Sequence, residues 1–325
     1  MTKRKSLALL AVVALVAGGF AAKANYGRIA VLAAPAKQAA TVRSPGALKA
    51  DSLFWRTLHT GDYDGIPRAI EELTRAYVEA PHDAVTAAHL AWLHIWRAAE
   101  RARLDTPPAS ITGHLVLARK YFEEAVRLDP ADARYLGFLA SAMLAEGFVD
   151  KNERLTRAGY FKLRESIDAW PEFNLFTGGY ALSVLPATSP QYQEGLRWQW
   201  GNLDVCVQET VDRADPSYAK YMTYATTHGA KRVCWNSWIA PHNFEGFFLN
   251  MGDMLVKAGD WGTARKIYEN AKLSATYASW KFREVLEDRI LNAERNVALF
   301  NTAGRHRDAT IMVSSAFSCM GCHEQ

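Results

Sequence analysis

The chain has 325 residues, of which 49% are hydrophobic and 22% are charged, and its formal net charge is +4. This length is more than one small core requires and suggests two domains or one extended array. The composition is typical of a folded protein and excludes a disordered chain or a membrane protein with many spans.

Residues 1–24 have the pattern of an export signal. Basic residues at positions 3–5 are followed by an apolar run over 7–22 and by the small-residue motif Ala22-Lys23-Ala24. A charged region, an apolar region and an A-x-A cleavage site in this order predict a signal peptide. The alternative is an uncleaved membrane anchor, although the run is near the short limit of a membrane span.

Export changes the charge balance. Cleavage after Ala24 removes four of the 38 basic residues and none of the 34 acidic residues, which leaves 34 of each. A net charge of zero does not favour binding to nucleic acid or to acidic membrane surfaces. We therefore expect a periplasmic or otherwise exported protein, attached to a membrane only if the N-terminal segment is not cleaved.

The next residues, 25–50, are rich in alanine and contain Pro35 and Pro45. This composition indicates a tether or a poorly ordered lead-in. Folded structure is therefore predicted to begin near Leu53.

Residues 51–176 repeat one spacing of side chains. A small residue, a large residue, a second small residue and a proline follow at intervals of 4, 3 and 5 in three segments, 69–81, 118–130 and 159–171. Small residues let one helix lie close to its neighbour, and the proline ends the helix. The pattern predicts amphipathic helices that must stack to bury their apolar faces.

The segment 242–301 is predicted to hold the last helical repeat and a long helix that starts near Ser274. Its first part carries the fullest version of the pattern, which consists of Phe248, Met251, Gly252, Leu255, Ala264, Tyr268 and Ala271. This segment resembles the tetratricopeptide repeat. The resemblance implies an all-α, tetratricopeptide-like solenoid that binds a protein or peptide on its surface. The three prolines lie 49 and 41 residues apart instead of the family's 34, and a generic helical bundle is the alternative.

Residues 177–241 depart from the repeat and contain several glycines and prolines, so they are predicted to form a loop-rich insert. Cys206 and Cys234 lie within it. Two remaining cysteines in an exported protein usually form a disulfide, which here would stabilise the fold by about 3 kcal/mol. Two separate buried thiols are the alternative.

The tail, residues 302–325, contains Cys319-Met320-Gly321-Cys322-His323. This C-x-x-C-H sequence is the attachment motif of c-type haem. Two thiols one helical turn apart suit the two vinyl groups, and the adjacent histidine suits the iron. We expect one covalent haem c held by Cys319 and Cys322 with His323 as axial ligand, and a Cys319–Cys322 disulfide or another metal site as alternatives.

The resemblance to c-type cytochromes is confined to this motif. In the small cytochromes c most of the fold follows the motif and supplies the distal ligand, whereas here only Glu324 and Gln325 follow. The distal ligand is therefore expected from the helical scaffold or from another subunit, unless it is absent.

Loop histidines are the first candidates for that ligand, because functional side chains are often on loops. His242 ranks before His228, and for each the alternative is an exposed loop histidine or a helix cap. Met312 is judged too near the motif. His89, Trp92 and Trp96 share one helical stripe, which favours core packing over a cofactor wall. Arg305 and Arg307 flank His306 and could pair with haem propionates if they are not simply solvated.

Three functions fit these features. The first is electron transfer with a docked redox partner, which requires two strong axial ligands. The second is an interaction scaffold in which the haem is structural, and the third is a haem sensor or enzyme with an open sixth position. No catalytic residue set is predicted, because no triad, phosphate loop or H-E-x-x-H motif occurs.

Overall fold

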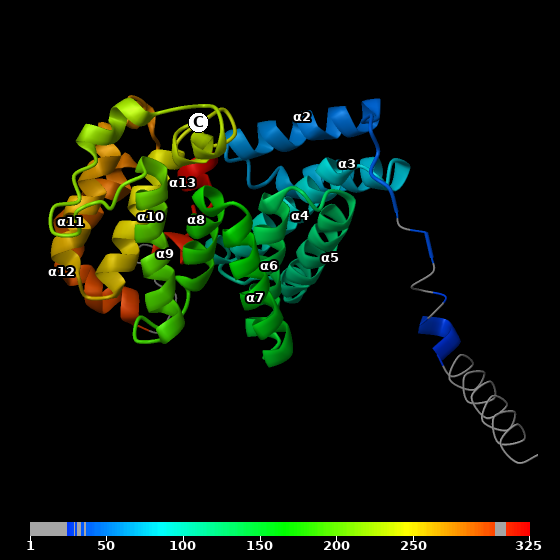
Figure 1. The fold of residues 1–325 in the computed structure, drawn as a ribbon, viewed down its shortest axis with the longest axis horizontal. Coiled ribbons are helices and arrows are strands. Elements are labelled where there is room, and N and C mark those ends of the chain that lie inside the picture. The colour runs from blue at the N-terminus through cyan, green and yellow to red at the C-terminus, as the bar shows by residue number, and fades with distance from the viewer. Residues whose placement is uncertain (1–24, 29, 31–33, 36, 303–309) are drawn as a thin grey trace, which may run out of the picture. The chain divides into compact units, whose positions relative to one another are not determined.

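The computed structural model describes residues 25–28, 30, 34–35, 37–302 and 310–325 (Figure 1). The chain divides into two compact units, residues 1–38 and 39–325. In the first unit residues 25–28 are helical. The predicted signal peptide, residues 1–24, lies outside the described residues, as do Arg305, His306 and Arg307.

The second unit is all-α over its described residues, as the sequence predicts. Consecutive helices pack against each other along the chain, so most contacts are between neighbours in sequence. Among the described helices none is both long and apolar enough to cross a bilayer. The longer helices are α2 (Pro45–His59), α3 (Ile66–Glu79), α4 (Ala84–Ala99), α5 (Gly113–Leu128), α6 (Ala133–Val149), α7 (Glu153–Ala169), α8 (Pro171–Leu182), α9 (Pro190–Val207), α10 (Asn243–Lys257), α11 (Trp261–Glu269) and α12 (Arg283–Asn301).

Short helical turns connect or follow these helices. They are η1 (Glu100–Arg103), η2 (Ala109–Thr112), η3 (Ala219–Tyr224), η4 (Ala230–Cys234), η5 (Asn270–Leu273), η6 (Tyr277–Ser279), η7 (Met312–Ser314) and the one-turn helix α13 (Met320–His323).

The small–large–small stripes are buried in every predicted segment. Leu73 in α3, Phe122 in α5, Leu163 in α7 and Tyr268 in α11 are each at most 1% exposed. Gly252 shows why a small residue is needed: a Cβ there would lie 2.2 Å from Cε1 of Tyr268. These stripes therefore place the helices at close range, as their spacing predicts.

The lead-in is shorter than the predicted 25–50. Helix α2 begins at Pro45, where the Ser44 side chain accepts a hydrogen bond from the Ala47 amide. A serine cap followed by proline at the first helical position is a standard helix start. Ala47 and Ala50 are buried, so this alanine-rich end of the segment belongs to the core.

The prediction of a loop-rich insert over 177–241 is wrong for its first part. Helix α8 extends to Leu182 and α9 covers Pro190–Val207, which leaves irregular backbone mainly over 208–242. Gly178 and Gly179 lie within helix α8, and their lack of side chains leaves room for side chains of α9. A Cβ would lie 2.9 Å from the Trp198 ring at the first position and 2.1 Å from Gln199 Nε2 at the second.

The long helix predicted from Ser274 begins instead at Arg283. The turns η5 and η6 precede it and bring the Trp280 side chain into the core, where it is 1% exposed. The Trp280 Nε1–H donates a hydrogen bond to the Gly321 carbonyl (2.9 Å), which links this turn to the tail.

Candidate functional site

The C-terminal tail lies between α2 and the α10–α12 helices of the second unit, and Figure 1 marks the C-terminus near the upper edge of the view. The amide of His242 donates to the Cys322 carbonyl (3.0 Å), and the amide of Gln325 donates to the His59 carbonyl (2.9 Å). These bonds tie α13 to the start of α10 on one side and to the end of α2 on the other.

The same short helix joins two hydrophobic clusters. Met320 is fully buried with Phe54 and Leu58 of α2, while Cys322 is buried with residues of α10 and α12. Gly246 of α10 makes this approach possible, because a Cβ at that position would lie 2.3 Å from Cys322 Sγ. The C-x-x-C-H segment is therefore held by packing on both sides.

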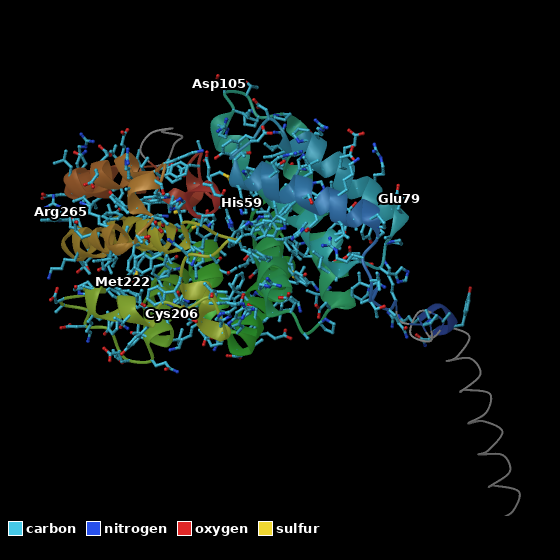
Figure 2. All side chains as sticks on the ribbon, turned by 90° about the horizontal axis from the view of Figure 1, so that it is seen from above. His59, Glu79, Asp105, Cys206, Met222 and Arg265 are labelled. Atoms are coloured by element: carbon cyan, nitrogen blue, oxygen red, sulfur yellow. A yellow bond between two sulfur atoms is a disulfide. The ribbon has the colours of Figure 1, made fainter. Side chains whose placement is uncertain are left out.

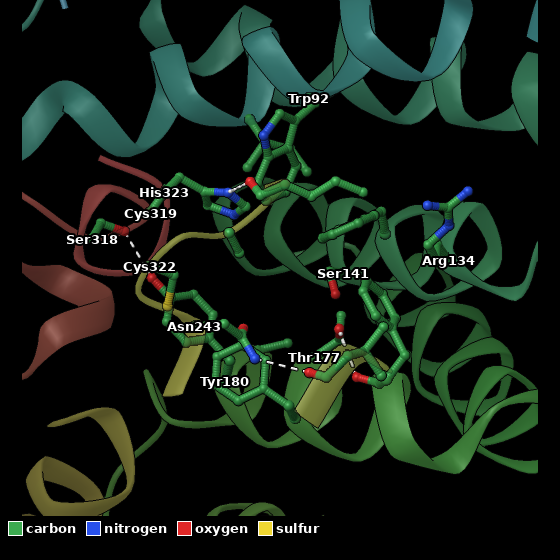
Figure 3. A pocket seen from close by; sticks show the side chains of 18 of the residues that line it. Trp92, Arg134, Ser141, Thr177, Tyr180, Asn243, Ser318, Cys319, Cys322 and His323 are labelled. Carbon is green, nitrogen blue, oxygen red and sulfur yellow. Dashed lines mark hydrogen bonds between the residues drawn. The ribbon is translucent and has the colours of Figure 1, made fainter. Parts of the chain in front are cut away.

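A large cavity opens beside the motif. Its volume is about 1150 Å³, slightly above the usual range for ligand pockets. Cys319, Cys322 and His323 line one side of it, and Arg134 lies at the opposite side (Figure 3). The wall is rich in aromatic side chains, including those of Phe54, Trp55, Trp92, Phe138, Phe173, Phe176, Tyr180 and Phe247.

His323 is oriented by the backbone. Its Nδ1 lies 2.9 Å from the Ile239 carbonyl oxygen, which fixes the proton on Nδ1 and leaves Nε2 as the free ring nitrogen. Burial lowers the pKa of His323 to about 4, partly offset by this hydrogen bond, so the imidazole is neutral. A neutral imidazole held through its other nitrogen is the usual arrangement of a metal-binding histidine.

The two motif cysteines are free thiols in this structure. Burial raises the pKa of Cys319 to about 11 and also raises the pKa of Cys322, so both are protonated at neutral pH. The turn before them has an unusual conformation, with φ of 24° at Ser318. The hydroxyl of Ser318 is 2.8 Å from that of Tyr180, a contact that positions this turn at the cavity wall (Figure 3).

Neither predicted distal histidine lies on the cavity wall. His242 is 3% exposed, and its Nδ1 contacts Glu245 Oε1 at 3.1 Å, so it packs behind the motif. His228 is exposed in the 208–242 loop. A loop position indicates accessibility but not direction, which is why sequence reasoning ranked these two first.

The stripe of His89, Trp92 and Trp96 has two roles. His89 and Trp92 line the cavity, whereas Trp96 is buried and packs edge-on to Tyr63. The Trp92 ring meets the His323 ring with centroids 5.9 Å apart. The interpretation of this stripe as core packing therefore holds for Trp96 and in part for Trp92, which packs against two core clusters and also lines the cavity.

The predicted disulfide between Cys206 and Cys234 is present, with Cα atoms 5.9 Å apart. It joins the end of α9 to η4 in the irregular segment, and both cysteines line the cavity. Figure 2 labels Cys206, which lies on the far side of the molecule from Asp105. The bond closes residues 206–234, and Ile239 follows shortly after this closed segment.

Sequence reasoning missed the Ile239 carbonyl and the aromatic wall. A backbone acceptor has no sequence signature, and the rings come from five different helices, α2, α4, α6, α8 and α10. Among the described residues no cluster of three or more His, Cys, Asp or Glu side chains could hold a bare metal ion. A haem iron requires only one or two protein ligands.

The comparisons with known proteins give no further guidance. No protein-family model, curated protein or solved structure matches the chain.

Proposed function

We propose that this protein is an exported c-type cytochrome that carries one covalent haem and exchanges electrons with a docked protein partner. The observation that supports it most is the convergence of Cys319, Cys322 and the oriented His323 on one wall of an apolar cavity of about 1150 Å³. A C-x-x-C-H motif on an exposed loop would lack such a chamber.

The residues present fit a haem. Cys319 and Cys322 would hold it through thioethers, and His323 would ligate the iron through Nε2. A haem held there supplies a one-electron couple. The aromatic wall would keep water away from the iron, and the arginines that line the cavity, Arg101, Arg134 and Arg232, would offer cationic partners for carboxylates.

An aromatic contact leads from the site to the surface. Trp238 is 62% exposed, and its ring lies 4.8 Å from that of Trp55 and 5.1 Å from that of His59. The next residue, Ile239, holds His323 through its carbonyl. An exposed tryptophan beside the axial ligand suits a contact with a redox partner.

The scaffold is part of this proposal. We regard the helical pairs as a tetratricopeptide-like repeat whose surface receives the partner, in accord with the buried small–large–small stripes. Export rests on the pattern of residues 1–24 and agrees with the disulfide, which belongs to an oxidising compartment.

The test is expression with a c-haem maturation system, followed by haem staining of a denaturing gel. We expect covalent haem in the native chain, and its loss or strong reduction in Cys322→Ala, with His228→Ala, an exposed residue away from the cavity wall, as the control that keeps it. A colourless native chain would contradict the proposal. A high-spin native spectrum that binds CO would favour a haem sensor or enzyme, and haem without reversible reduction would favour a structural role.

A further inference from the structure

Few side chains on the cavity wall can ligate iron opposite His323. Among the described lining residues, the imidazole and thioether groups outside the motif are those of His89 and Met312. The lining cysteines Cys206 and Cys234 are consumed by their disulfide. The choice for a second axial ligand in the cavity is therefore between His89 and Met312.

His89 is held in place on α4. Its ring stacks on Phe54 with centroids 4.1 Å apart and planes 5° apart, and the Trp55 ring meets it edge-on at 5.2 Å. Its Nδ1 lies 2.6 Å from Asp51 Oδ1, an electrostatic contact in which the N–H is not well aligned with the oxygen. One face and one nitrogen of the ring are thus already engaged.

Further charged side chains support the Asp51 carboxylate. Arg43 lies 3.4 Å from Asp51 and 2.9 Å from Asp83, and Asp83 is 3% exposed. Metal-binding histidines commonly have a carboxylate on the nitrogen that does not bind the metal, and that carboxylate is itself supported. Nε2 of His89 has no hydrogen-bond partner among the described residues and is not an enclosed atom.

His89 and His323 both line the cavity and are linked through neighbouring aromatic rings. Trp92, one turn after His89 on α4, contacts the His323 ring. Trp55, which contacts His89, also contacts Trp238, the neighbour of Ile239. Both histidines are anchored through Nδ1, one by a carboxylate and one by a carbonyl, so both retain Nε2.

Met312 is placed less well. It is 1% exposed, and its methyl group lies 2.5 Å from the position of a Cβ on Gly321. Its amide is bound by Asp253 at 2.7 Å. The Met312 side chain is therefore enclosed against Gly321 of the motif, whereas the His89 side chain is 16% exposed.

We propose that Nε2 of His89 is the second axial ligand of the haem iron. This inference rests on the proposed function, since it requires the covalent haem. With imidazole on both sides the iron is six-coordinate and low-spin, which suits electron transfer and closes the iron to small ligands.

The experiment uses the holoprotein, with its visible and electron paramagnetic resonance spectra and CO binding as readouts. We expect a low-spin native protein that does not bind CO when reduced. His89→Ala should become high-spin and bind CO, and added imidazole should restore the low-spin spectrum. His228→Ala, an exposed histidine, and Met312→Leu, the rival ligand, should both keep the native spectrum.

A second variant guards against misfolding. If His89→Ala yields no folded protein, His89→Met should yield a low-spin spectrum with the charge-transfer band of a methionine–iron bond. A haem-loaded His89→Ala with the native low-spin spectrum would overturn the inference, as would a high-spin native protein or a loss of the low-spin state in Met312→Leu. Those results leave the haem attached, whereas a colourless native chain would refute the proposed function as well.

Discussion

The cavity has one wall made by regular helices and another made by irregular backbone. On the first, α4, α6 and α8 contribute aromatic rings, and their other faces pack through buried stripes. On the second, α13 and the 208–242 segment contribute the thiols, the His323 imidazole and the carbonyl that orients it. The helical side thus supplies shape and the irregular side supplies most of the chemistry, a common division between scaffold and loops.

Truncation of the regular side should cost the most stability. Leu163 is fully buried in α7 with Ala140, Leu144 and Leu182. Leu163→Ala should lower the free energy of unfolding by about 2–5 kcal/mol. Urea unfolding measures this loss, and haem per folded molecule should not change. If the folded variant carried less haem per molecule than the folded native protein, the proposed division between a wall that supplies shape and a wall that supplies chemistry would be wrong.

Removal of the disulfide tests the irregular side. The double variant Cys206→Ala, Cys234→Ala frees a loop with a sequence separation of 28. The unfolded chain then gains entropy, and the free energy of unfolding should fall by about 3–4 kcal/mol. Urea unfolding of native and double-variant holoprotein gives the value, and the haem should stay attached because its thiols are different ones. Equal stability of the two proteins would contradict this.

Acid should weaken the regular side through a histidine pair. Nδ1 of His94 on α4 lies 2.8 Å from Nδ1 of His114 on α5, and burial, with the charge of His114, lowers the pKa of His94 to about 4. In the unfolded chain His94 binds a proton below about pH 6.5, whereas in the folded chain it binds one only near pH 4. The free energy of unfolding therefore falls as the pH falls through this window.

Between pH 7 and pH 4, the stability of the native protein relative to His94→Phe should decrease by about 3 kcal/mol. Thermal or urea unfolding at several pH values checks this. His228→Phe serves as the control, because His228 is exposed and its substitution should leave the pH dependence unchanged. A pH-independent difference between native protein and His94→Phe would rule out the pair as the cause.

The smallest expected change in stability comes from two glycines of α10, which form a matched pair for comparison. Gly246→Ala places a Cβ against Cys322, whereas Gly252→Ala places one against Tyr268. Each should cost about 1–3 kcal/mol through overpacking. Only Gly246→Ala should also lower the yield of covalent haem, measured by the stain intensity per folded protein. Equal haem yields in the two variants would show that the motif tolerates displacement by α10.

The sequence predicts the repeated helix faces well and the packing between separate helices poorly. The spacing around Leu73, Phe122 and Leu163 identified buried helix faces, because one helical period is a local property. The glycines at 178 and 179 were misread as loop residues, since the side chains that need their space, Trp198 and Gln199, are on another helix. The pairing of Cys206 with Cys234 followed from compartment and count alone.

The C-x-x-C-H motif could be recognised from the sequence because its residues are adjacent. The residues that surround it in the fold could not be predicted. The direction in which His242, His228 and His89 point depends on how separate helices meet. Their order as candidate ligands could therefore be revised only once the cavity was known.

The contact between His323 and the Ile239 carbonyl has a consequence for how such proteins diverge. The acceptor is a main-chain atom, so a change of side chain at position 239 does not remove it. Related chains can therefore carry different side chains at position 239 and still hold the His323 imidazole in the same tautomer. Alignment-based searches for orienting residues will pass over it, and only a comparison of backbone paths will find it.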